Sequence, residues 1–218
     1  MSQRMDSTEF ASAVKTLKRA RSFFSLLVAL ALLVQLGGFV MLYFFRETIN
    51  VDALASFQQS LEAGKVVWNW HNVMFWAVNM SKLLALFSGC MVVAILAITN
   101  LVVIVGGGKG ARLFITASLW SLLLLLLVSP WQDILRGGLL RGAMYNLDTL
   151  RTWIAEMPGP KSGELKLDFH AVRFFAQFMG YPIISLLVLI MSLVRFGQGY
   201  RQIVAANRLD KQLPGQGS

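Results

Sequence analysis

Residues 23–45 read FFSLLVALALLVQLGGFVMLYFF. This run contains no charged side chain and lies between Arg21 and Arg46. Its 23 residues, at 1.5 Å each, give a helix of about 34 Å, which exceeds the ~30 Å hydrocarbon core of a bilayer. The run is longer than the ~7–15-residue apolar region of a signal peptide, and 22 residues precede it. The sequence therefore predicts a retained transmembrane helix.

Three further apolar runs have the same character, at residues 83–105, 113–130 and 174–194. The last contains Pro182, which removes a backbone hydrogen bond and is expected to kink its helix. Together the four runs predict an all-α integral membrane protein, in which four transmembrane helices form a bundle with additional amphipathic interfacial helices.

The composition excludes other classes of protein. Of 218 residues, 56% are hydrophobic and only 14% are charged, whereas soluble domains are about 25% charged. A soluble core of this size could not bury so much apolar surface. Cys90 is the only cysteine, so neither a disulfide scaffold nor a multi-cysteine metal site fits.

The orientation follows from Lys and Arg. Eleven Lys and Arg residues and three acidic residues lie in residues 1–22, 106–112 and 195–218. The two longer loops hold nine Lys and Arg residues and eight acidic residues, spread over about 79 residues. This bias favours cytoplasmic termini and a bacterial inner (cytoplasmic) membrane. The predicted parts are a cytoplasmic amphipathic N-terminal helix at 1–21, a membrane domain at 22–195, with outer loops 46–82 and 131–173, and a cytoplasmic C-terminal tail at 196–218.

Two segments outside the spans show helical periodicity. The N-terminal segment places Lys15, Lys18 and Arg19 beside an apolar stripe, which is typical of a helix on the inner leaflet or of a docking site for a partner. The loop at residues 131–173, the third loop along the chain, has a pattern that predicts a helix of about 20 residues, ended by Pro158. Its stripe is expected to face lipid, another protein or a short helix predicted in the first outer loop, from Asp52 to Gly64. The stripe consists of Leu140, Met144, Leu147, Leu150, Ile154 and Met157.

The segment before the second span is rich in tryptophan. Residues 66–76 contain three tryptophans, which favour the headgroup level of a membrane. The segment is expected either to extend the second helix or to lie flat on the outer leaflet.

The four apolar runs contain no Asp, Glu, Lys, Arg or His. Pumps, proton relays and ion-coupled transporters place such groups inside the bilayer, so this absence argues against them. The sequence also lacks the common hydrolase and metalloprotease motifs. We therefore expect no catalytic residue, no metal site and no enzymatic activity.

The two histidines leave one cofactor alternative open. His71 and His170 precede the second and fourth spans, and two facing imidazoles could ligate a haem b iron, as in a membrane cytochrome that exchanges electrons with quinone. Both lie outside the apolar runs, and interfacial histidines more often face headgroups or bond to loop backbone. The first expectation is that the chain holds no cofactor.

Three functional interpretations remain. The first is a non-catalytic structural or accessory subunit, a scaffold in a larger membrane complex. The second is the haem subunit, and the third is a channel or transporter component. The expected partners are the lipid bilayer and other membrane subunits, or a second copy of the chain. The net charge is +9, but no nucleic-acid partner is expected, because no nucleic-acid motif accompanies the charge.

Overall fold

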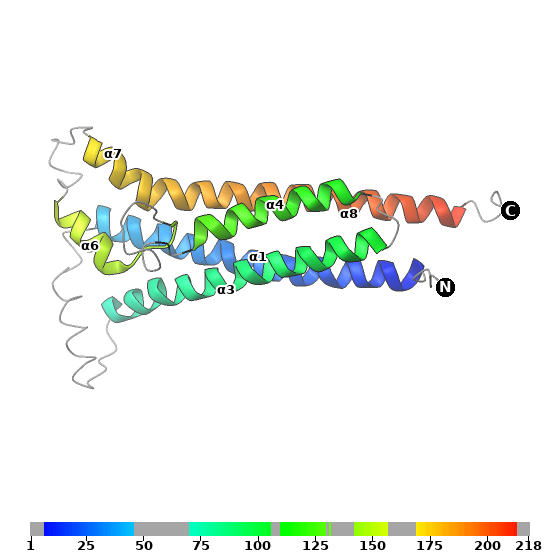
Figure 1. Ribbon diagram of the computed structural model, residues 1–218. Helices are drawn as coiled ribbons and strands as arrows, with labels where there is room; N and C mark the ends of the chain where they lie inside the picture. Colours follow the sequence, from blue (N-terminus) through cyan, green and yellow to red (C-terminus); the bar gives the residue numbers. More distant parts are fainter. Residues whose placement is uncertain are drawn as a thin grey trace. The chain divides into compact units, whose positions relative to one another are not determined.

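The computed structural model describes residues 7–45, 70–105, 110–129, 131, 142–156 and 169–212. Within these ranges the backbone is helical almost throughout and contains no strand. The elements, shown in Figure 1, are α1 (Ser7–Phe44), α3 (Trp70–Val105), α4 (Ala111–Val128), α6 (Leu147–Glu156), α7 (Phe169–Phe175), the π-helix η1 (Ala176–Gly180) and α8 (Tyr181–Gln212).

Four helical stretches are long and apolar enough to cross a membrane: Ser12–Phe44, Val73–Val105, Ala111–Val128 and Phe169–Ala206. Each overlaps one predicted run, so the all-α membrane fold with four spans is confirmed. The helices extend beyond the apolar runs. The 38 residues of α1 correspond to about 57 Å, well beyond the thickness of a hydrocarbon core.

The helices continue where the apolar runs end, at both ends of the chain and before the second run. No break at residue 21 separates an N-terminal helix from the first span, since α1 is continuous and its Val14 is buried. The predicted C-terminal tail is helical to Gln212, and its Ile203 is buried. Part of the predicted loop 46–82 belongs to α3, which begins at Trp70, so the helical-extension interpretation holds for 70–82.

The chain forms two compact units. The terminal unit comprises residues 1–27, 87–126 and 187–218, and the central unit comprises residues 28–86 and 127–186.

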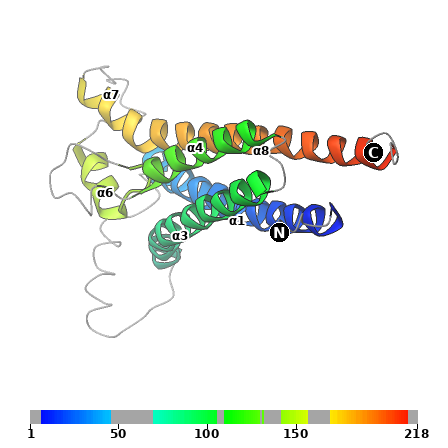
Figure 2. The same cartoon turned by 45° about the vertical axis from the view of Figure 1, so that its right-hand side comes forward.

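In the terminal unit, α1, α3, α4 and α8 share one apolar core. Figure 2 shows the first part of α1 beside the last part of α3. The Phe114 and Phe196 rings meet edge to face at 5.0 Å between centroids. Gly199 permits this contact, because a Cβ there would lie 2.9 Å from the Phe114 ring. The buried members of the core are Val14, Val92, Leu96, Val103, Phe114, Ala117, Phe196 and Ile203.

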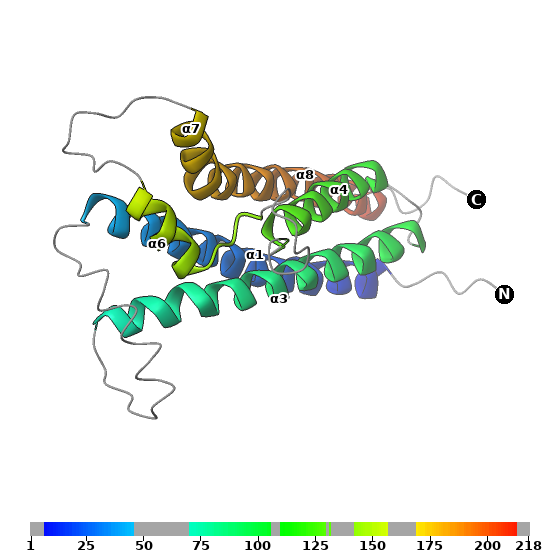
Figure 3. The same ribbon diagram turned by 60° about the vertical axis from the view of Figure 1, so that its left-hand side comes forward.

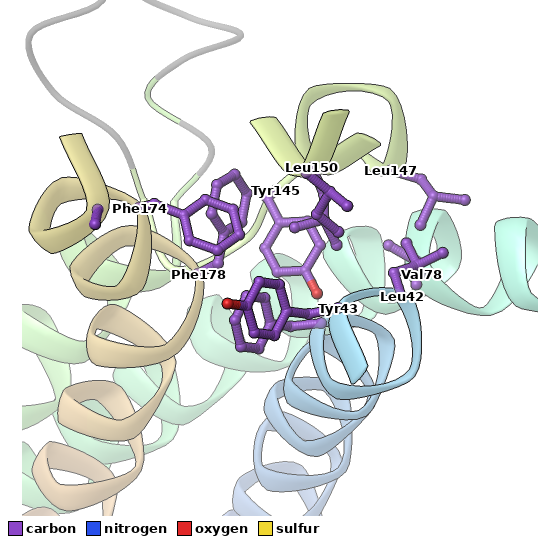
Figure 4. Packing of buried hydrophobic residues seen from close by; sticks show 11 residues of the cluster. Leu42, Tyr43, Val78, Tyr145, Leu147, Leu150, Phe174 and Phe178 are labelled. Carbon is purple, nitrogen blue, oxygen red and sulfur yellow. The ribbon is translucent and has the colours of Figure 1, made fainter. Parts of the chain in front are cut away.

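In the central unit, buried aromatic side chains from α1, α7, η1 and the non-helical segment 142–146 pack together (Figure 4). The Phe39 ring of α1 stacks on Tyr43 at 5.6 Å, and the Phe174 and Phe178 rings of α7 and η1 lie 5.2 Å apart. Tyr145 meets Phe178 at 5.1 Å. Figure 3 shows α6 at the end of α1. The apolar side chains of α6 belong to this core.

The predicted helix of about 20 residues in the third loop is wrong in length. Residues 142–146 are not helical, and α6 has only 10 residues. The backbone here runs against the end of α4: the Ala143 N–H donates to the Leu127 carbonyl at 2.7 Å. A Cβ at Gly142 would lie 2.0 Å from the Ser129 carbonyl oxygen. This close backbone contact prevents a helical turn that the apolar spacing alone would allow.

The backbone is irregular immediately before Pro182. The Tyr181 N–H donates to the Ala176 carbonyl, five residues back, which closes the wider turn of η1. Pro182 has no N–H to offer the Phe178 carbonyl. The π-helical turn therefore lies directly before the position at which proline removes an α-helical hydrogen bond.

Candidate functional site

Arg21 is buried, with an exposed fraction of 2%. It lies on α1 in the terminal unit, and its Nη2 donates a hydrogen bond of 2.8 Å to the Ser192 hydroxyl of α8. The guanidinium lies over the Phe196 ring, 4.3 Å from the centroid, in cation–π geometry. Arg21 thus belongs to the packed interior, although the sequence interpretation placed it only as a flank of the first span.

Ser192 connects Arg21 to α4. Its hydroxyl donates to the Ala117 carbonyl at 3.1 Å and lies 2.7 Å from the Ser121 hydroxyl. The Arg21 Nε has no hydrogen-bond partner among the described residues. The network joins three helices through one arginine and two serines, which is the kind of polar contact that holds membrane helices together.

Positive charge is not balanced in the described part of the terminal unit. None of the side chains described at residues 12–27, 87–105, 110–126 and 187–206 is Asp or Glu. Seven are basic: Lys15, Lys18, Arg19, Arg21, Arg112, Arg195 and Arg201. An excess of this size favours an anionic surface or ligand nearby.

A half-open cavity of about 650 Å³ lies in this unit between the start of α4 and α8. Its lining includes two arginines, Arg112 and Arg195, and two uncharged polar residues, Thr116 and Gln202. Gly110 lines its edge with φ +81°, a left-handed conformation that favours glycine and lets the chain turn into α4. The remaining lining residues are Ala111 and Leu113.

The predicted basic residues of the N-terminal segment lie on α1. Lys15 and Arg19 are exposed. The Lys18 ammonium lies 4.1 Å from the centroid of the Tyr200 ring of α8. The amphipathic pattern is therefore partly explained by packing within the terminal unit, and contact of these side chains with lipid or a partner stays a prediction.

Of the two histidines, only His170 has a described side chain. His170 is exposed at the start of α7, and its ring stacks on the Trp153 indole of α6 at 4.8 Å and 12°. The Arg173 guanidinium also lies near that indole, at 5.7 Å. The side chain of His71 lies outside the described ones. A haem held by His71 and His170 therefore stays an untested alternative, and no described observation favours it.

No metal site emerges from the described part of the chain either. No group of three or more His, Cys, Asp or Glu side chains that could hold a metal ion occurs there.

The apolar stripe of the third loop is not lipid-facing or partner-facing where it is described. Met144, Leu147, Leu150 and Ile154 are all at most 2% exposed. Leu147, Leu150 and Ile154 pack in the aromatic core of their own central unit. That contact partner was not among the predicted ones, so the prediction is wrong for these four residues. Leu140 and Met157 lie outside the described residues.

A signal for the buried Arg21 does exist in the sequence. Arg21, Ser25, Val28 and Gln35 recur at spacings that place them on one face of a helix, and all four are buried. An arginine in phase with the polar positions of a transmembrane helix is a candidate for interior packing. The cavity carries no such signal, because its walls come from residues some 80 positions apart.

Comparison with known proteins gives no relative: no family model, curated protein or solved structure matches this chain.

Proposed function

We propose that this chain is a non-catalytic integral membrane subunit that acts as a structural or accessory component of a larger membrane complex. The observation that carries the proposal is the apolar surface, to which all four spanning helices contribute. Large exposed side chains include Leu26 on α1, Leu83 on α3, Leu119 on α4 and Leu187 on α8. Such a surface is covered by lipid or by another membrane protein.

The interior contacts support the same proposal. In the central unit, the Gln35 amide donates to the Ser81 hydroxyl at 2.8 Å and to the Val78 carbonyl at 3.1 Å. In the terminal unit, the Asn100 amide donates to the Ser118 hydroxyl at 2.8 Å. These polar groups bond to each other between helices, as in a structural bundle.

The proposal includes a location and an orientation. We place the chain in a bacterial inner membrane with both termini in the cytoplasm. In support, the described side chains of the terminal unit include seven Lys and Arg, whereas those of the central unit include three, at Lys82, Arg151 and Arg173. Basic residues near the ends of spans favour the cytoplasmic side.

The test is the composition and activity of the complex taken from the native membrane without detergent, in polymer-bounded discs. We expect the chain to be recovered with another membrane polypeptide in a fixed integer ratio. We also expect the purified chain to be colourless and to conduct no ions in liposomes. A Soret band that is lost in His71→Ala or His170→Ala would replace this proposal with the haem subunit. Ion flux through the chain alone would replace it with a channel.

A further inference from the structure

The cavity at the start of α4 has the composition of an anion site. It is lined by Arg112 of α4 and Arg195 of α8, two arginines on different helices. Guanidinium groups bind phosphate through two parallel hydrogen bonds, and arginine is favoured wherever phosphate is recognised. Gln202 adds a side-chain amide, a group that donates to phosphate oxygens, whereas the Thr116 hydroxyl donates to the Arg112 carbonyl at 2.8 Å. Two arginines from separate helices line the same cavity, which distinguishes this place from a surface with scattered charges.

The backbone adds positive potential at the same opening. The cavity is lined by Ala111, Arg112 and Leu113, the first residues of the 18-residue helix α4. The positive end of a helix dipole attracts anions. With no carboxylate among the described side chains of the terminal unit, nothing described there competes for the two arginines.

Exposed apolar side chains continue from the cavity along both helices. On α4, Leu119 follows Thr116 by three residues and is 61% exposed. On α8, Met191 and Leu187 precede Arg195 by four and eight residues and are 48% and 57% exposed. Residues at these spacings lie on the same face of a helix. The cavity therefore lies at one end of two rows of exposed apolar side chains, one on α4 and one on α8.

We propose that this cavity binds the phosphate group of an anionic phospholipid, whose acyl chains lie along the apolar rows of α4 and α8. A free phosphate would satisfy the arginines but would make no use of the apolar rows, which is why the observations favour a lipid. This binding would place the start of α4 at the headgroup level of an anionic leaflet. The proposal does not depend on the proposed structural function.

The experiment uses the full chain, purified in detergent and titrated with lipid, and native mass spectrometry counts the lipids that stay bound. The probes are phosphatidylglycerol, zwitterionic phosphatidylethanolamine and inorganic phosphate. We expect one tightly bound phosphatidylglycerol that neither of the other probes displaces at matched concentration. Arg112→Gln and Arg195→Gln should each weaken its binding about 5-fold, and the double variant about 25-fold, because each basic residue contributes similarly to attraction of an anionic headgroup.

The matched control is Arg201→Gln, which removes an exposed arginine of α8 that does not line the cavity. It should leave the affinity unchanged. Gln202→Glu gives a second variant, because a carboxylate beside the two arginines should weaken binding without removing either of them. All the cavity side chains changed are exposed, so the variants should keep the folded elution profile of the parent.

The outcomes separate the sources of phosphate. Equal affinity in Arg112→Gln, Arg195→Gln and Arg201→Gln would overturn the proposal. Binding of phosphatidylethanolamine as tight as that of phosphatidylglycerol would also overturn it. Displacement of the lipid by inorganic phosphate would assign the cavity to a soluble phosphate and overturn the lipid assignment.

Discussion

Arg21 brings a guanidinium into the interior of the terminal unit, where it meets a serine hydroxyl and an aromatic ring. Removing a charge from water is costly, and the gain from neutral partners offsets only part of that cost. Removal of its hydrogen-bond partner should therefore lower stability, whereas removal of the guanidinium itself should not.

Ser192→Ala should lower the free energy of unfolding by about 1–3 kcal/mol, because it leaves the buried guanidinium without its acceptor. Arg21→Met should leave it unchanged or raise it, because an apolar side chain of similar length replaces the charge. Unfolding of both variants in mixed micelles, followed by circular dichroism, measures the difference. A greater loss in Arg21→Met than in Ser192→Ala would contradict this interpretation of the network.

Gly142 is the position with the least room for a side chain. A methyl group there would overlap the Ser129 carbonyl, so Gly142→Ala should cost about 3 kcal/mol, the upper end of overpacking effects. Gly37 on α1 is the matched control, because no atom lies within 4 Å of the position of its Cβ. Gly37→Ala should stabilise the helix by about 0.5–1 kcal/mol. Equal unfolding midpoints for the two variants would show that the contact at Gly142 is absent.

Tyr145 connects stability to pH. Burial raises the pKa of its hydroxyl, which donates to the Gln35 carbonyl. The folded chain thus disfavours the phenolate, whereas the unfolded chain ionises near the ordinary value of about 10. Stability should be constant below about pH 10 and should fall above it, and Tyr145→Phe should reduce that fall. Unfolding measured from pH 8 to 11 in both proteins checks this, and the same decline in both would exclude Tyr145 as its source.

At the scale of elements, α6 shows where periodicity misleads. The stripe from Leu140 to Met157 indicated a long helix with an outward apolar face. The structure instead turns residues 142–146 along the end of α4 and buries the described members of the stripe, Met144, Leu147, Leu150 and Ile154, in the central unit. Helical spacing identifies a buried face, but it does not identify what covers that face.

Leu150 tests this packing, because it is 0% exposed in the aromatic core. Leu150→Ala should lower the free energy of unfolding by about 2–5 kcal/mol through the cavity it leaves. Ala155→Ser, on the exposed face of α6, should stay within about 0.5 kcal/mol of the parent. If Leu150→Ala instead left the stability of the isolated chain unchanged and weakened only its association with a partner, the stripe would face outward as first expected.

The sequence predicted the spans well and the site poorly, for physical reasons. A run such as 83–105 must be helical in a bilayer whatever surrounds it, because its backbone groups have no other partners there. Continuation of α8 to Gln212 depends on tertiary packing, as at Phe196 and Ile203. That Arg112 and Arg195 line the same cavity depends on which helices pack together, and no local pattern encodes that pairing.

In the molecule as a whole, the surface that the spanning helices expose carries the proposed function, and the interior holds the helices together. The interior of each unit holds packed aromatic and aliphatic side chains with hydrogen bonds between helices. If the chain is a subunit of a complex, a protein partner, and not lipid alone, must cover part of this apolar surface. Only a measurement in the intact membrane separates the two.

That measurement is photo-crosslinking at native expression level, with a benzophenone side chain placed in turn at Leu26, Leu83, Leu119 and Leu187, which are all exposed. Leu124, which is 1% exposed on α4, is the buried control. We expect at least one exposed position to yield an adduct of a single defined mass with another membrane polypeptide, whereas Leu124 should yield none. Lipid adducts alone at all four exposed positions would contradict a role as a subunit of a complex.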